Sequence, residues 1–285
     1  MDTPRLAGRD RSARRTSFAV LLVLGGSVCA GACGTDADTF VLGATTSTYD
    51  SGLLEHLIAC FNEEHPGLRV RTVIAGSGEA MELGRTGDVD LLLVHAPEAE
   101  VRFIEAGHAP RRRPVLFNEY VIAGPPSDPA RIRGSASPSE AFATLARGGH
   151  GFVSRGDSSG THHREIALWR EAGVAGGGTG YVESGQGQAT TLHVASERGA
   201  YVLTDDATLA MLSEVLDLVA LVEDHPSLRN IYSLLAPRAA IRPERAAAFA
   251  DWLRSGDGRR AIGEFRVRGG LEALFAPWPG DHPPN

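Results

Sequence analysis

Short apolar segments alternate with amphipathic segments along most of this chain, and this alternation constrains the fold more than any other feature of the sequence. The runs TFVLGA (39–44) and VDLLLVHA (89–96) are typical of buried strands, and a stretch with the apolar spacing of a helix follows soon after each. Strands that alternate with helices predict a mainly parallel sheet with helices packed on its faces. We therefore expect an α/β fold.

The same pattern predicts the other elements. Further strands are expected at residues 68–75, 113–125, 151–154, 180–184, 200–204, 216–223 and 230–238. Helices are expected at residues 51–67, 78–87, 97–108, 137–149, 161–173, 188–199, 243–258 and 259–269, and the glycine-rich segment 173–180 is expected to be a flexible loop.

Two longer extended runs, near residues 114–124 and 229–237, bracket a complete α/β unit. The simplest geometry is two α/β lobes joined by two crossing strands. We expect lobe 1 to comprise residues 33–117 and 232–285, and lobe 2 to comprise residues 118–231. Because open α/β sheets bind ligands beyond the carboxyl ends of their strands, the cleft between the lobes is the predicted ligand site.

The N-terminal residues are typical of an export signal. Five arginines lie within residues 1–15, and a short apolar run with small residues at its end follows them. We expect residues 1–32 to be removed. The sequence AGAC, which ends at Cys33, resembles a bacterial lipoprotein cleavage box, although Ala30 stands where Leu is usual. Lipidation of Cys33 is the interpretation that we prefer, and plain cleavage is the alternative.

The charged residues restrict the possible partners. All 28 cationic side chains are arginines, so chemistry that needs a lysine is excluded, and any fixed cation at a site must be a guanidinium. Without residues 1–32 the chain carries 23 arginines against 33 acidic residues, a net charge of −10. An acidic surface argues against nucleic acid and anionic membranes as partners. It does not argue against a small anion, which responds to local donors.

Polar residues follow four of the predicted strands. The run TTST begins at Thr45, Ser77 lies between two glycines, His95 follows the third strand, and RGDSSG begins at Arg155. Each of these loops leads into a helix, whose first turn offers unpaired backbone N–H groups and a partial positive charge. One such cluster alone would be an ordinary helix cap. Four of them at the same edge of the sheets predict a site for an oxyanion.

The types of polar group also bear on the ionisation state of the ligand. Hydroxyls, amides and one guanidinium are donors, which suits an anion without a proton, such as tungstate, molybdate or sulfate. A protonated phosphate needs an acceptor as well, usually a carboxylate. The third strand ends in His95 rather than an acidic residue. Asp157 is a possible acceptor, but we expect it to cap the next helix or to orient Arg155.

Several motifs resemble one known family. The segments TTST, LLLVHAPEAE, RRPVLFNEYVIAGP and SRGDSSGTH are similar in sequence and order to the TupA-type tungstate-binding proteins of bacterial ABC importers, and the resemblance extends over residues 40–275. It implies the type II periplasmic binding protein fold, with tungstate or molybdate as ligand. It also implies an exported protein that works with a membrane permease and its ATPase. We expect a monomer without a resident cofactor.

The resemblance also implies which residues hold the anion. From the first lobe these are Thr45, Thr46, Ser47 and Ser77, and from the second Arg155, Ser159, Gly160 and Thr161. SRGDSSGT also resembles the phosphate-binding relatives, but those carry an Asp near the position of His95. Its absence favours tungstate or molybdate, with phosphate or sulfate as alternatives. His95 itself either donates to the anion or packs.

Two other kinds of site remain possible on paper. GDSSG fits the G-x-S-x-G turn of a serine hydrolase, with Ser158 as nucleophile, but no oxyanion-hole loop of the HGGG type precedes it. The histidines His162, His163, His193 and His95 suggest a metal site. Adjacent histidines on a helix point about 100° apart, however, so they rarely share one ion. We therefore expect neither a catalytic residue nor a metal cation.

Overall fold

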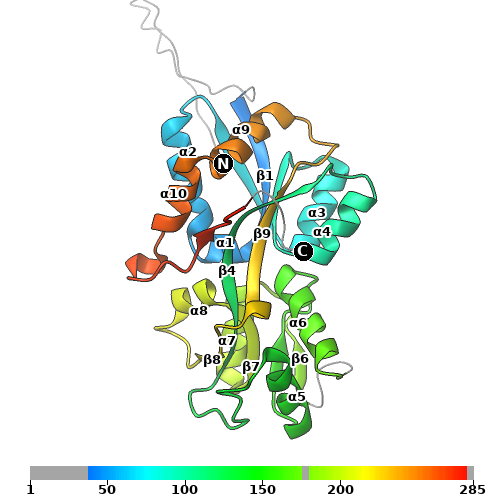
Figure 1. The fold of residues 1–285 in the computed structure, drawn as a ribbon, viewed down its shortest axis with the longest axis vertical. Coiled ribbons are helices and arrows are strands. Elements are labelled where there is room, and N and C mark those ends of the chain that lie inside the picture. The colour runs from blue at the N-terminus through cyan, green and yellow to red at the C-terminus, as the bar shows by residue number, and fades with distance from the viewer. Residues whose placement is uncertain (1–37, 175–179, 281–285) are drawn as a thin grey trace, which may run out of the picture. The chain divides into compact units, whose positions relative to one another are not determined.

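The computed structural model describes residues 38–174 and 180–280, and its strands form one path with the order β2-β1-β3-β9-β4-β7-β5-β6 (Figure 1). The strands are β1 (Thr39–Thr45), β2 (Arg69–Ala75), β3 (Leu91–Val94), β4 (Arg112–Gly124), β5 (Phe152–Ser154), β6 (Tyr181–Glu183), β7 (Tyr201–Asp205), β8 (Val219–Val222), β9 (Arg229–Leu235) and β10 (Ala276–Pro277). β8 and β10 each pair with β4 beside this path. The predicted α/β fold is confirmed.

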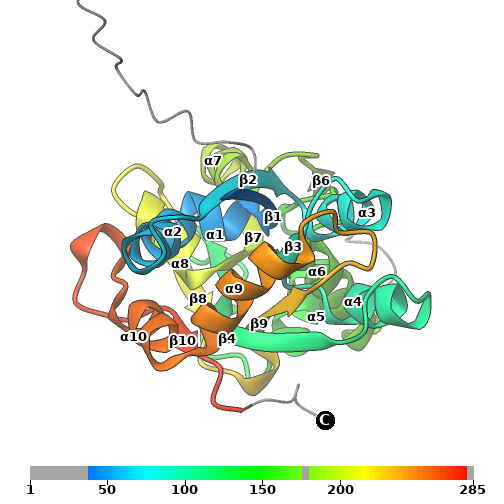
Figure 2. The same ribbon diagram turned by 90° about the horizontal axis from the view of Figure 1, so that it is seen from above.

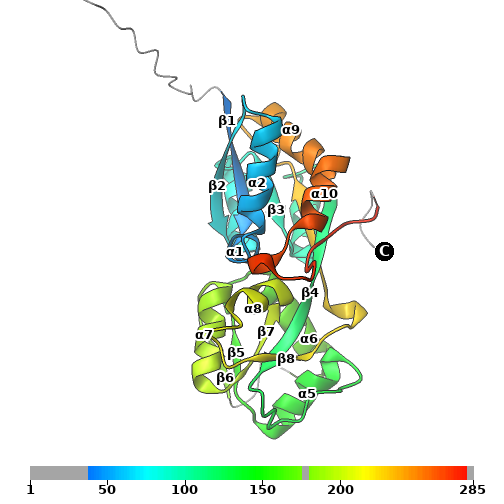
Figure 3. The same cartoon turned by 90° about the vertical axis from the view of Figure 1, so that its left-hand side faces the viewer.

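Strand β4 belongs to both halves of the sheet. Its residues 112–119 pair antiparallel with β9, and residues 120–124 pair with β7 and β8. In the first half β1 is parallel to β2 and β3, and in the second half β5 is parallel to β6 and β7. Figure 3 shows β4 running from one half into the other. The two extended runs predicted from the sequence are therefore the crossing strands.

Helices cover both faces of each half (Figure 2). Around the first half lie α1 (Thr46–Asp50), α2 (Leu53–Glu64), α3 (Ser77–Thr86), α4 (Pro97–Glu105), α9 (Pro243–Arg254) and α10 (Gly256–Glu264). Around the second half lie α5 (Pro138–Gly148), α6 (Gly160–Glu171), α7 (Gln188–Arg198) and α8 (Asp206–Leu212). Two short 3-10 turns are η2 (Pro226–Leu228) and η3 (Val267–Gly269).

The first half has a core on each face of its sheet. Phe40 of β1 packs with Phe61 of α2 and Phe249 of α9 on one face, and Met81 of α3 and Phe103 of α4 pack on the other. The second half is built in the same way. Its two cores are covered by α5 and α6 on one face and by α7 and α8 on the other. Burial of each large apolar side chain contributes about 1.5–3 kcal/mol, so these cores hold the loops between them in place.

The structure differs from the sequence predictions at two short helices. The segment after β1, expected to be a loop, forms α1, in which the Thr48 hydroxyl donates to the Thr45 carbonyl at 2.8 Å. Helix α8 was not predicted. It follows β7 directly because the Asp205 carboxylate accepts from the backbone N–H of Thr208 at 2.9 Å and caps the helix.

Some predictions fall outside the described residues. The export signal at 1–32, Cys33 and the centre of the loop at 173–180 lie there. The proposed lobe boundaries stay predictions. Among the helices at residues 38–174 and 180–280, none is long and apolar enough to cross a membrane.

Candidate oxyanion-binding site

The first polar loop starts where β1 ends. Thr45 has extended backbone angles and is the N-cap of α1, and Thr45 and Ser47 are each 1% exposed. Their hydroxyl oxygens lie 3.2 Å apart, and the Ser47 hydroxyl also contacts the Tyr232 hydroxyl at 2.9 Å. Thr46, the first residue of α1, is half-buried. The loop thus presents hydroxyl groups that are held in place from behind.

The second and third polar loops meet at Ser77. This residue opens α3 after β2 and is fully buried, and its hydroxyl accepts a hydrogen bond from the backbone N–H of His95 at 3.3 Å. His95 follows β3 and is 4% exposed. Because β1, β2 and β3 are parallel, their carboxyl ends lie at the same edge of the sheet. The predicted residues of the first lobe therefore share this edge.

The ring of His95 is a neutral hydrogen-bond donor. Asn230 donates through its side-chain nitrogen to Asn118 Oδ1 at 2.8 Å and to the Tyr232 hydroxyl at 3.1 Å. Its Oδ1 is left to accept from His95 Nδ1 at 2.8 Å. Burial lowers the pKa of His95 to about 4, so the ring carries no charge at neutral pH. His95 therefore adds no cation to the site.

Arg155 supplies the guanidinium from the second lobe. The residue follows β5 and is 2% exposed. Its Nε donates to the Gln186 carbonyl at 2.7 Å, its Nη1 donates to Gln188 Oε1 at 3.0 Å, and its Nη2 pairs with the Asp157 carboxylate. A guanidinium has five N–H groups, so two remain after these three bonds. The other Asp157 oxygen accepts from the backbone N–H of Ser159 at 3.1 Å.

The start of α6 supplies further donors. Ser159 is the N-cap, and its hydroxyl oxygen accepts from the backbone N–H of His162 at 3.2 Å, which leaves the hydroxyl proton free to donate. Gly160 and Thr161 are buried in the first turn. Thr161 Oγ1 lies near the Tyr120 hydroxyl but makes no hydrogen bond of normal geometry with a described residue. A buried hydroxyl without a partner is unfavourable, so its position indicates a place for a ligand oxygen.

The two sets of residues face each other closely. A Cβ atom added to Gly160 would lie 2.5 Å from the carbonyl oxygen of His95, and one added to Gly76 would lie 3.6 Å from the Cα of Ser159. Gly76 and Ser159 are the N-caps of α3 and α6, so the N-termini of these two helices meet across the two halves. A Cβ on Gly187, between the two glutamines that hold Arg155, would lie 3.9 Å from Thr46 Cγ2. The described conformation is closed.

A group of polar side chains behind the site was not predicted from the sequence. Asn118 and Tyr120 lie on β4, Asn230 and Tyr232 lie on β9, and Asn118 is opposite Asn230 in the antiparallel register. Tyr120 contacts His95 Nδ1 at 3.0 Å. The signal was present in the sequence, since both crossing strands contain Asn-x-Tyr. Gln188, at the start of the helix predicted at 188–199, was also not predicted to lie at the site.

The structure gives no support to the hydrolase alternative. Ser158 is exposed at a sharp turn with a φ of 57°, a conformation that a nucleophile turn and an anion-binding loop share, so the neighbouring groups decide between them. The nearby His162 uses Nδ1 to accept from the backbone N–H of Ser158 at 3.0 Å. A serine hydrolase would also need an acid and a histidine after Ser158, for which the sequence offers Asp205, Asp206 or Asp224 with His225. Asp205 accepts a hydrogen bond from the Thr208 hydroxyl, and His225 contacts the Ser227 hydroxyl. Across residues 38–174 and 180–280, no group of three or more His, Cys, Asp or Glu side chains is arranged to hold a metal ion.

Two α/β halves joined by crossing strands, with buried donors between them, define the class of type II periplasmic binding proteins. A family model described as a PBP superfamily domain matches residues 30–257. A candidate anion-binding protein of an ABC transporter from Haloferax volcanii is 41% identical over 245 residues, which are 83% of this chain and 71% of the relative.

Two further relatives carry more specific names. The tungstate-binding protein TupA of Peptoclostridium acidaminophilum is 35% identical over 246 residues, 84% of this chain and 85% of the relative. The crystal structure of the tungstate ABC transporter from Geobacter sulfurreducens has a TM-score of 0.73 and 37% identity, and the match covers 80% of this chain and 99% of that one. The chain therefore belongs to the PBP superfamily and, within it, to the family of the TupA-type binding proteins. The resemblance seen in the sequence is confirmed.

Proposed function

We propose that this protein captures tungstate, or the closely similar molybdate, outside the cytoplasm and delivers it to an ABC transporter. The observation that supports the proposal most directly is the convergence of buried donors from both lobes, including the unpartnered Thr161 hydroxyl and two helix N-termini. Tungstate is the oxyanion that the names of two similar proteins specify. The proposed ligand residues are Thr45, Thr46, Ser47, Ser77, Arg155, Ser159, Gly160 and Thr161.

The donor set favours an anion that carries no proton. Both carboxylate oxygens of Asp157 are already engaged, one with Arg155 and the other with the backbone N–H of Ser159. His95 is neutral and donates through Nδ1 to Asn230, so its Nε2 is the ring's acceptor, and a protonated anion would have to reach that nitrogen. A monohydrogen phosphate would need an acceptor for its proton, and its burial without one would be unfavourable by about 1–3 kcal/mol. Tungstate and molybdate are fully ionised at neutral pH and need only donors.

The proposed action is capture and release without chemistry on the anion. One lobe binds first, and rotation about the crossing strands β4 and β9 brings the other lobe over it. Closure removes water, which strengthens each charge-assisted hydrogen bond. We further propose that the protein is a monomer anchored through a lipidated Cys33, and that its closed form docks on a permease that an ATPase drives.

The test is calorimetric titration of the purified protein with tungstate, molybdate, sulfate and phosphate. We expect tight one-to-one binding of tungstate and no detectable heat from phosphate. Comparison of the tungstate and molybdate curves measures the selectivity between these two anions. Failure of all four anions to bind, together with ester hydrolysis that is lost in Ser158→Ala, would overturn the proposal in favour of a hydrolase.

A further inference from the structure

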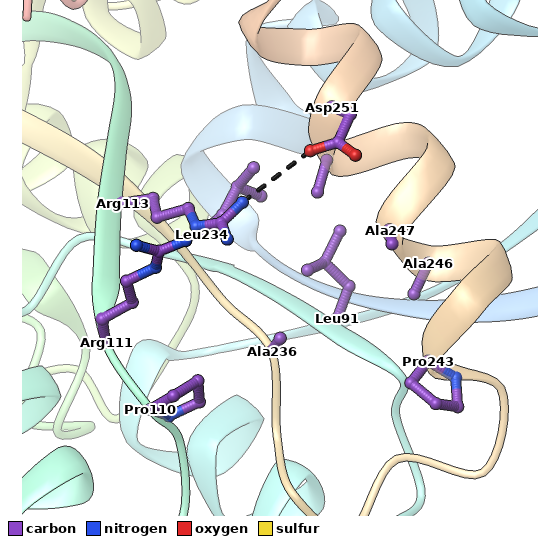
Figure 4. Close-up of a pocket in the computed structure, with 11 residues that line it drawn as sticks. Leu91, Pro110, Arg111, Arg113, Leu234, Ala236, Pro243, Ala246, Ala247 and Asp251 are labelled. Atoms are coloured by element: carbon purple, nitrogen blue, oxygen red, sulfur yellow. Dashed lines mark ion pairs between the residues drawn. The ribbon is translucent and has the colours of Figure 1, made fainter. Parts of the chain in front are cut away.

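A second pocket lies on the first half of the molecule, at a distance from the candidate oxyanion site. It has a volume of about 160 Å³ and opens between the start of β4 and helix α9 (Figure 4). Leu91, at its base, is the first residue of β3, whereas His95 of the oxyanion site follows the last. Four residues of strand span about 13 Å, so the two sites lie toward opposite ends of the same strand.

The floor of this pocket is apolar. It is formed by Leu91 of β3, Leu234 of β9 and Ala236, with Ala246 and Ala250 of α9 on the facing side. Alanines on α9 leave space above the sheet that larger side chains would fill. A buried cavity of about 150 Å³ with apolar walls is large enough for benzene. The pocket therefore accommodates an apolar body of about the size of a benzene ring.

Two guanidinium groups border the same pocket. Arg111 and Arg113 extend side by side from the start of β4 toward α9 (Figure 4). Arg112 points away from them, as alternation along a strand requires, and forms an ion pair with the buried Glu100 at 2.8 Å. The run of three arginines at 111–113 thus divides into one ion pair with a buried glutamate and two residues at the pocket.

The positive charge at the pocket is poorly neutralised. Arg111 has no hydrogen bond or ion pair with another described residue. Within residues 38–174 and 180–280, Arg113 forms an ion pair with Asp251 alone, at 3.8 Å, and the Asp251 side chain is 72% exposed. Burial and the nearby charges of Arg111 and Arg254 lower the pKa of Arg113. Two guanidiniums beside an apolar cavity attract an anion that also has an apolar part.

We propose that this pocket is a second binding site, for a small organic carboxylate. The carboxylate lies between the guanidiniums of Arg111 and Arg113, and its apolar body lies over Leu91 and Leu234 against the alanines of α9. The proposal goes beyond transport of the oxyanion and does not depend on it, because none of these residues belongs to the candidate oxyanion site.

The test uses benzoate as the probe and NMR of the purified protein as the readout. Benzyl alcohol has the same apolar body without the charge, and acetate has the charge without the apolar body. We expect benzoate to cause saturable shifts in the amides of α9 and of the start of β4, and to bind at least about tenfold more tightly than either control, because each control lacks one of the two groups that the pocket contacts.

Variants of the pocket test the same proposal. Arg111→Gln with Arg113→Gln should weaken benzoate binding about tenfold, and Ala247→Phe, at the exposed rim, should block it. Arg133→Gln with Arg147→Gln is the matched control, since it removes the same charge from exposed positions of the second half. Thermal unfolding checks that each variant is folded.

Several results would overturn the proposal. If acetate bound as tightly as benzoate, the apolar part of the pocket would play no role in binding. If benzyl alcohol bound as tightly as benzoate, the two guanidiniums would play no role. An equal loss of affinity in the Arg133 and Arg147 control would show that only net charge matters. The absence of saturable shifts near α9 with benzoate would contradict the site directly.

Discussion

Replacement of Gly160 by alanine is the sharpest test of how this protein closes on its ligand. Gly160 is the first residue of α6, and a Cβ atom there would lie 2.5 Å from the carbonyl oxygen of His95 and 2.7 Å from its Nδ1. An ordinary van der Waals contact begins at 3.4 Å. The obstacle is backbone of the opposite half, so a side-chain rotation cannot relieve it. We expect Gly160→Ala to prevent full closure.

The size of the effect follows from the distances. To restore an ordinary contact, α6 must move away from His95 by about 1 Å, and hydrogen bonds of normal length would then stretch beyond their useful range. Loss of two bonds from the α6 N-terminus to the anion, each worth about 1.5–3 kcal/mol, weakens binding by at least about 3 kcal/mol, or about a hundredfold. Gly160 has no positive φ, and alanine favours helix over glycine by up to about 1 kcal/mol. The free variant should therefore be at least as stable as the parent.

Calorimetry with tungstate measures the loss, and small-angle scattering with and without tungstate measures closure. Gly187→Ala is the matched control, because Gly187 is also an N-cap between the lobes but its added Cβ would lie 3.9 Å from Thr46 Cγ2. This control should bind nearly as the parent does. If Gly160→Ala bound tungstate with parental affinity and closed fully, the described contact between the lobes would not belong to the bound state.

Further predictions concern single side chains. Arg155→Gln should weaken tungstate binding at least about a hundredfold in calorimetry, because it removes the guanidinium and leaves the Asp157 carboxylate unpaired beside the anion. Ser158→Ala should bind like the parent, since this side chain is exposed; a large loss would show that the loop geometry is different. Burial raises the pKa of the Glu165 carboxyl from 4.5 to about 7, so the folded protein binds this proton more tightly than the unfolded chain does. The resulting stabilisation is complete below about pH 4.5 and is lost as the pH rises through about 7. Glu165→Gln should reduce the fall in unfolding free energy between pH 5 and pH 8, measured by urea denaturation, by up to about 3 kcal/mol; an unchanged pH profile would contradict the assignment.

Long elements with clear periodicity could be predicted from the sequence, and short ones could not. The strands around Leu42 and Leu92 were found because their apolar runs are flanked by helical patterns. Helix α8 was missed because it follows β7 without a break, and Asp205 is both the last strand residue and the N-cap. Helix α1 consists of polar residues, and it forms because tertiary packing buries Ser47 and Thr48. Tertiary contacts of this kind leave no periodic signal in the sequence.

The sequence predicted those residues of the candidate site that directly follow a strand, and it did not predict those that lie within a strand. Ser77, Arg155 and Ser159 follow strands, so the rule that loops gather at one sheet edge brought them together. Asn118 and Asn230 lie within the crossing strands, and their contact depends on the antiparallel register of β4 and β9, which the sequence does not specify. The polar side chains that support Ser47 and His95 could therefore not be predicted from the sequence. The ligand roles of the predicted residues stay predictions.

The distribution of charge explains why closure matters so much for an anion-binding protein of this kind. Residues 33–285 have a net charge of −10, and the charge of Arg155 is largely balanced by Asp157. Exposed charges more than about 8 Å apart are largely screened at physiological salt, so the acidic surface has little effect on an anion that approaches through solvent. The groups left to attract the anion are local ones. They are the hydroxyls of the site and the N-termini of α3 and α6, each of which carries about half a positive charge. These dipoles act over a short range, so they bind the anion tightly only when both lobes touch it, as the contact at Gly160 allows.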